Sequence, residues 1–257
     1  MKKFLRPKYL PLYVTAAALV GMLLRIWTFG DGPDKAGLYA PQPLAWTLLW
    51  IVTALTLGAM IFLSQPLKVS GPYKAEFPQS LPAAIGALPA AFVLMLSSLK
   101  ILTASSGNLM ALLTGLTGVV AAMALLLVAF GRYQGKQPSF PVHILICLHL
   151  SIRVFYQSRT WGNEPQIGTI LLPFLASICV MLATYHLSRF DVNLGSRRMC
   201  VFWNLSAVYF SILAMPHSDE WLFHGAMAVW MMTSLCSLRP RKPAPSTELD
   251  QSADTPQ

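Results

Sequence analysis

Ionisable side chains are rare in this chain, and those near the ends of long apolar stretches are the first candidates for chemistry. Arg25 and Arg153 each occupy such a position. An ionisable group costs roughly 2.5–3.5 kcal/mol at the centre of a membrane span, so it usually serves binding, transport or pairing. A basic site built on these two arginines would bind or translocate a small solute or a lipid headgroup. The other candidates for this site are Lys100, His149, Tyr156, Gln157, Arg159, Asp31 and Glu164.

Three of these candidates share one face of a helix. His149, Arg153 and Tyr156 or Gln157 follow one another at spacings of three to four residues. The resulting polar stripe would line a permeation path or a headgroup pocket if it faced the interior of a bundle. Hydrogen bonding between helices would use the same side chains for packing, and ion pairs with Asp31 or Glu164 would pin short loops. Both alternatives stay open.

Histidines allow a second, enzymatic hypothesis. His217 and His224 frame the segment HSDEWLFH, which resembles the His and acidic residues that hold zinc in ceramidase-like membrane hydrolases. A catalytic zinc ion needs three protein ligands and an open position, and His149 would be the third ligand. The sequence has no Walker, HExxH or GxSxG motif. We therefore favour a non-enzymatic function with no resident cofactor or metal, and keep a zinc-dependent lipid hydrolase as the alternative.

The elements that must position these residues are membrane spans. Hydrophobic residues make up 55% of the chain, charged residues 11%, and the mean hydropathy is +0.55. Continuous apolar runs predict helices instead of barrel strands. We expect an all-α, polytopic transmembrane bundle of eight helices in residues 1–242. The expected helices are Leu10 to Phe29, Pro43 to Ser64, Leu81 to Thr103, Asn108 to Gly131, Phe140 to Ser158, Gln166 to Ser188, Met199 to Met215 and Trp221 to Leu238.

The net charge of +9 indicates topology and not nucleic-acid binding, because the basic residues lie between apolar runs. An eight-span plasma-membrane protein with both termini in the cytoplasm satisfies the positive-inside bias. Arg25, Lys35, Lys100, Arg153 and Arg159 then lie at the outer face. Residues 243–257 predict a disordered cytoplasmic tail. The other fourteen of the 19 basic residues are cytoplasmic in this topology: Lys2, Lys3, Arg6, Lys8, Lys68, Lys74, Arg132, Lys136, Arg189, Arg197, Arg198, Arg239, Arg241 and Lys242.

The two halves of the chain suggest an internal repeat. Aligning the sequence with itself so that Arg25 matches Arg153 places LRIW on IRVF. Each arginine is followed by an acidic residue and then by a long apolar span. Repeats over 1–136 and 137–242, with four spans each, would have the same orientation in the membrane. The alternative is that both arginines anchor helix ends at the interface.

Three segments resemble one known group of proteins. LLRIWTFGDGPDKAGLY, IRVFYQSRTWGNEPQ and YHLSRFDVNLGSRR are similar to an uncharacterised family of multi-span membrane proteins from Gram-positive anaerobes. The resemblance implies a membrane bundle and no particular activity. The remaining alternative is a structural or assembly partner of another membrane complex, with Gly115, Gly118 and Thr114 as a close-packing surface.

Overall fold

The computed structural model describes residues 10–30, 41–65, 67, 72–105, 107–161, 167–216 and 218–239. The regular elements within these ranges are all helices, which confirms the all-α prediction. The eight long helices match the predicted ones within three residues at each end, and the short α3 was not predicted. Their bounds are α1 Leu10–Thr28, α2 Pro43–Ser64, α3 Tyr73–Glu76, α4 Leu81–Ala104, α5 Leu109–Gln134, α6 Phe140–Trp161, α7 Ile167–Asp191, α8 Arg197–Ala214 and α9 Trp221–Cys236.

Five helices in the described ranges are long and apolar enough to cross a membrane. They are α1, α2, α4, α5 and the Gly168–Asp191 part of α7. The helix α9 is apolar but shorter, at 16 residues. An α-helix needs about 20 apolar residues to span the hydrocarbon layer, so these five alone make the chain a multi-pass membrane protein. That α6, α8 and α9 also cross the membrane stays a prediction.

Local sequence signals explain where several helices begin and end. The side chain of Asn108 accepts hydrogen bonds from the amides of Met110 and Ala111, and so caps the first turn of α5. The same helix ends at Gly135, whose φ of 68° is left-handed and favours glycine. A proline in the first turn of α2, Pro43, removes an amide that would have no helical partner.

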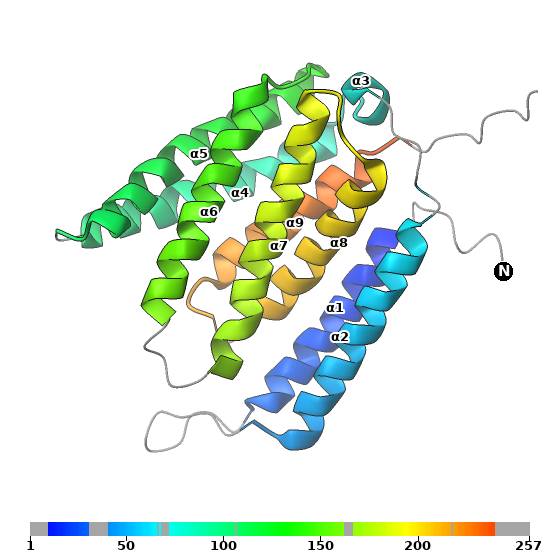
Figure 1. The fold of residues 1–257 in the computed structure, drawn as a ribbon, viewed down its shortest axis with the longest axis vertical. Helices are drawn as coiled ribbons and strands as arrows, with labels where there is room; N and C mark the ends of the chain where they lie inside the picture. The colour runs from blue at the N-terminus through cyan, green and yellow to red at the C-terminus, as the bar shows by residue number, and fades with distance from the viewer. Residues whose placement is uncertain are drawn as a thin grey trace, which may run out of the picture.

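The helices alternate in direction, so the bundle has two ends (Figure 1). Helices α6, α7, α8 and α9 pack together, the hairpin α1–α2 packs on α8, and the hairpin α4–α5 packs on α6 and α9. We call one end the α3 end, after the short helix that lies there. The other is the Arg25 end, where α1, α4, α6 and α8 finish and α2, α5, α7 and α9 start.

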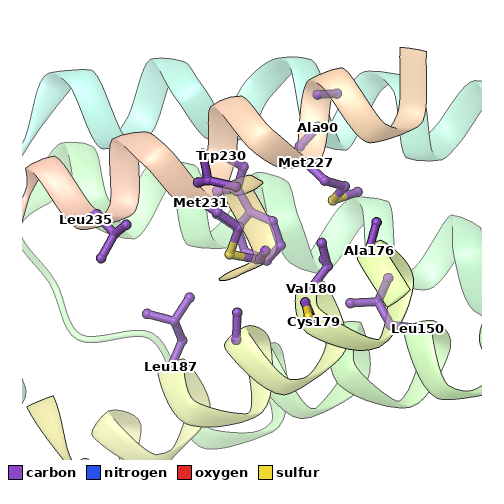
Figure 2. Close-up of a cluster of buried hydrophobic side chains, with 14 of the residues drawn as sticks. Ala90, Leu150, Ala176, Cys179, Val180, Leu187, Met227, Trp230, Met231 and Leu235 are labelled. Atoms are coloured by element: carbon purple, nitrogen blue, oxygen red, sulfur yellow. The ribbon is translucent and has the colours of Figure 1, made fainter. Parts of the chain in front are cut away.

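The apolar core lies between these ends. Figure 2 shows Met227, Trp230 and Met231 of α9 pointing toward Ala176 and Val180 of α7. Trp230 and Met231 are almost completely buried, whereas many large apolar side chains on the outer faces of α1, α2, α4 and α5 are exposed. Exposed apolar faces on a helical bundle are suited to contact with lipid chains.

Two glycines allow close approach of helices. A Cβ atom at Gly86 of α4 would lie 2.6 Å from the Cβ of Thr233 of α9. A Cβ at Gly118 of α5 would lie 2.9 Å from the Cβ of Ser98 and from the Cε1 of His149. The prediction that Gly118 belongs to a close-packing surface is confirmed. The internal repeat stays a prediction, and the tail 243–257 lies outside the described residues.

Candidate functional site

Four of the predicted site residues are buried near the Arg25 end. The exposed fractions are 0% for Arg25 and His149, 1% for Arg153 and 4% for Gln157. They come from α1 and α6, and Glu220, which immediately precedes α9, and His224 of α9 lie in the same region. We call these six residues the buried cluster.

Arg25 binds the ends of two other helices through backbone carbonyls. Its Nη1 donates to the carbonyl of Leu213 at 2.5 Å and its Nη2 to the carbonyl of Thr169 at 3.0 Å. The carbonyl of Leu213 belongs to the last turn of α8, where carbonyls have no amide four residues ahead in the helix. The carbonyl of Thr169 faces Pro173, which has no amide hydrogen to donate. Neither carbonyl therefore accepts the regular hydrogen bond from an amide four residues ahead in its helix, and Arg25 donates to both.

Arg153 is paired with a carboxylate and an aromatic ring. Its Nη2 lies 2.8 Å from Oε1 of Glu220, and its guanidinium lies 3.9 Å from the ring centroid of Phe223. Within the described residues, Nε and Nη1 of Arg153 have no hydrogen-bond partner, although both are buried. A buried donor without an acceptor is costly, so these two atoms could donate to an acceptor on a further ligand.

Gln157 extends this arrangement by one helical turn. Its Nε2 donates to Oε2 of Glu220 at 2.7 Å, and its Oε1 accepts from the hydroxyl of Ser177 at 3.2 Å. The two oxygens of Glu220 therefore contact different residues of α6. The side chain of Glu220 is 34% exposed, whereas its partner Arg153 is 1% exposed.

Two buried histidines border the arginines. Nδ1 of His149 lies 3.2 Å from the hydroxyl of Thr117. Within the described part of the chain, Nε2 of His149 and both ring nitrogens of His224 lack hydrogen-bond partners. Arg153 and Arg25 both lie within electrostatic range of the His224 ring.

The balance of charge favours an anion over a metal ion. Counted over its described residues, the buried cluster holds two guanidinium groups and one carboxylate. Charges in a membrane interior interact strongly because the dielectric constant is low, so this site attracts a negative group and repels a divalent cation. No group of three or more His, Cys, Asp or Glu side chains in the described ranges is placed to hold a metal. The zinc hypothesis also needs His217, which lies outside those ranges.

The other predicted site residues are exposed or half-buried, or are not among the described residues. Lys100 is exposed at the end of α4, Tyr156 is half-buried, and Arg159 is exposed with its guanidinium 5.2 Å from the Phe155 ring centroid. Asp31 and Glu164 lie outside the described residues, so their pairing with the arginines stays a prediction.

The α3 end contains a second set of buried polar residues that the sequence did not reveal. Arg197 pairs with Glu76 at 2.7 Å, and Nδ1 of His143 lies 2.6 Å from Oδ2 of Asp191. Arg132 lies over the Phe77 ring at 4.0 Å. The sequence places Arg132 and Arg197 among the charges that set topology, and the structure buries both side chains.

This second set joins helices and balances its own charge. The backbone carbonyl of Arg239 accepts from Nη2 of Arg197, and the amide of Tyr73 donates to the side chain of Asn193. Burial raises the pKa of Tyr73, and the Arg132 charge opposes that shift. Glu76 and Asp191 offset Arg132 and Arg197, so the buried charges of the α3 end balance and suit a packing role, whereas the buried cluster at the Arg25 end has two arginines and one carboxylate.

Comparison of the chain with family models, with curated proteins and with solved structures finds no match. The family resemblance of the three segments therefore stays a prediction, and function must be argued from the buried cluster.

Proposed function

We propose that this membrane protein binds or translocates a small solute or lipid headgroup that carries a negative charge, at the buried cluster of the Arg25 end. The observation that carries the proposal is Arg153: it is almost completely buried, and two of its nitrogens lack acceptors within the described residues. An acidic ligand group would place acceptor oxygens at this guanidinium. Charge-assisted hydrogen bonds to arginine are among the stronger ones in proteins.

The distribution of basic residues supports an outward-facing site in a plasma membrane, with both termini in the cytoplasm. Lys74, Lys136, Arg189 and Arg198 lie toward the α3 end, whereas Lys100 and Arg159 lie toward the Arg25 end. Cytoplasmic connections retain the larger share of Lys and Arg. The Arg25 end therefore faces outward in this proposal.

Native mass spectrometry of the full chain released from detergent tests the proposal, because it gives the mass of any retained anion. We expect a bound solute or anionic lipid on the unmodified protein. Arg153→Lys keeps the charge and loses the planar guanidinium, so we expect its affinity for the retained ligand to fall about tenfold, a loss of roughly 1.4 kcal/mol in binding, and its occupancy to fall with it.

Lys100→Gln is the matched control, since it removes a positive charge from the same end without changing the buried cluster. Equal occupancy in the unmodified protein and Arg153→Lys, or equal losses in Arg153→Lys and Lys100→Gln, would contradict a specific site. Elution of each variant as a single folded species establishes that lost binding is not lost structure.

A further inference from the structure

Glu220 has the contacts that a bound carboxylate would have. Its Oε1 faces Nη2 of Arg153 at 2.8 Å and its Oε2 accepts from Nε2 of Gln157 at 2.7 Å. Arg153 and Gln157 are four residues apart on α6, so their polar ends project from the same face of that helix. Together they hold a planar group with two oxygens.

We infer that the ligand's acidic group is a carboxylate and that it replaces the carboxylate of Glu220 on Arg153 and Gln157. This inference rests on the proposed function and names the class of ligand and its place in the site. In the absence of ligand, Glu220 fills the position and keeps Arg153 paired. When the ligand arrives, the side chain of Glu220 turns toward water.

The position of Glu220 makes this exchange feasible. Its side chain is 34% exposed, and the residue precedes the first turn of α9, with φ −104° and ψ 25°. Its backbone amide is held separately, by the hydroxyl of Ser218 at 3.2 Å. The side chain can therefore leave without unwinding α9. Arg153 is almost completely buried and lies over the Phe223 ring. Glu220 therefore has more freedom to move than Arg153.

Charge balance favours a carboxylate over a phosphate. Exchanging one monoanionic carboxylate for another leaves the net charge of the cluster unchanged, so the ligand meets the electrostatic environment that Glu220 already occupies. A phosphate group has a different shape and can carry a second negative charge at neutral pH. The two donors, spaced for the two oxygens of one carboxylate, match the smaller planar group.

Competition by Glu220 predicts a measurable effect on affinity. A binding site occupied by its own side chain has an apparent affinity reduced by the fraction of time that the site is free. If Glu220 occupies the site about nine-tenths of the time, its removal lowers the half-saturating ligand concentration about tenfold. The probe is sodium acetate, added to the full chain in phosphatidylcholine nanodiscs at constant ionic strength, and the readout is the midpoint of thermal unfolding.

We expect Glu220→Gln to respond to about tenfold less acetate than the unmodified protein. Asp219→Asn is the matched control, because Asp219 is the exposed neighbour and its substitution removes the same charge. It should shift the acetate response less than about twofold. If Glu220→Gln does not fold, Glu220→Asp takes its place in the test. Because it shortens the competing side chain, it should bind acetate more tightly than the unmodified protein.

The outcomes separate this inference from the proposed function. An acetate response that Arg153→Lys abolishes and Glu220→Gln leaves unchanged overturns the exchange and retains the anion site. A response of Glu220→Gln to inorganic phosphate at lower concentration than to acetate overturns the assignment to a carboxylate. No response to either anion in any variant, combined with no retained anion in native mass spectrometry, overturns both proposals.

Nanodiscs of two lipids identify the source of the carboxylate. Phosphatidylserine and phosphatidylglycerol have the same net charge, but only phosphatidylserine carries a carboxylate. Greater stabilisation of Glu220→Gln by phosphatidylserine supports exchange with a lipid headgroup. Stabilisation by acetate with no preference between the lipids supports exchange with a soluble carboxylate.

Discussion

Arg25 and Arg153 are both fully buried arginines, yet their partners give them different roles. Arg25 donates to two backbone carbonyls that do not accept the regular i+4 amide bond of their helices, and so joins α1 to α7 and α8. Arg153 faces a carboxylate that is partly exposed and an aromatic ring. A backbone carbonyl cannot leave its helix, whereas a side-chain carboxylate can. Arg25 therefore joins the bundle and contributes charge, and Arg153 is the residue that our proposal assigns to a ligand.

The link between Arg25 and Pro173 can be tested with a double-mutant cycle. Arg25→Gln should lower the free energy of unfolding, because hydrogen bonds from a charged donor contribute about 1.5–3 kcal/mol. Pro173→Ala restores an amide that can donate to the carbonyl of Thr169. In that background the loss caused by Arg25→Gln should be smaller by more than about 0.5 kcal/mol, measured by chemical unfolding in detergent.

Strictly additive effects of Arg25→Gln and Pro173→Ala would contradict this account. They would mean that the carbonyl of Thr169 does not depend on Arg25. Ser177→Ala is a useful control in the same helix, because its hydroxyl donates to the carbonyl of Pro173 and to Gln157 but does not contact Arg25.

At the scale of elements, the helices could be predicted from apolar runs, and the buried cluster only in part. Arg25, His149, Arg153 and Gln157 stood out because polar residues are rare in such runs. The partnership of Glu220 with Gln157 could not be predicted, since the two residues are 63 positions apart and their helices meet only in the folded bundle. A segment such as α3, with four residues, is too short to show a periodic pattern.

The pair of Glu76 and Arg197 fixes α3 against α8, and its loss should be costly. Both side chains are buried, with exposed fractions of 1% and 6%. Removing one partner of a buried ion pair costs about 3–5 kcal/mol. We expect Glu76→Gln to lower the thermal midpoint of the protein in detergent. Lys74→Gln, an exposed position on the same short helix, should change it little, and equal effects would contradict the pair's importance.

Two glycines should respond in opposite directions to the same substitution. Gly86→Ala would place a Cβ 2.6 Å from the Cβ of Thr233, so α4 and α9 must separate, at a cost of about 1–3 kcal/mol. Gly58 in α2 has open space around it, so Gly58→Ala should be neutral or add up to about 1 kcal/mol of helix stability. Unfolding in detergent measures both, and destabilisation by both variants alike would show that helix packing is not the cause.

At the scale of the whole molecule, polar residues are buried at both ends and the apolar core lies between them. Among the buried side chains that the structure describes, Glu76 and Asp191 offset Arg132 and Arg197 at the α3 end, whereas the buried cluster sets two arginines against one carboxylate. Such an asymmetry gives the two membrane faces different chemistry. The apolar contact of α7 with α9 separates these polar regions (Figure 2).

The orientation of the bundle can be measured by labelling cysteines in intact cells. In a variant without the four native cysteines, Lys100→Cys should react with a membrane-impermeant maleimide from outside, because Lys100 is exposed toward the Arg25 end. Lys136→Cys, exposed at the α3 end, should react only after the cells are permeabilised. The reverse pattern would place the Arg25 end in the cytoplasm and contradict an outward-facing site.

The hydrogen bonds of Arg25 also have a consequence for how the protein is made. Leu213 follows Arg25 by 188 residues. At a synthesis rate of about 5–20 residues per second, its partner carbonyl emerges from the ribosome roughly 10–40 s later. During that interval Arg25 lacks the acceptor that Leu213 provides in the folded protein. Helix α1 can therefore complete its contact with α8 only after α8 has been made. A truncated or stalled chain leaves α1 with a charged side chain in the membrane, a feature that cellular quality control can recognise.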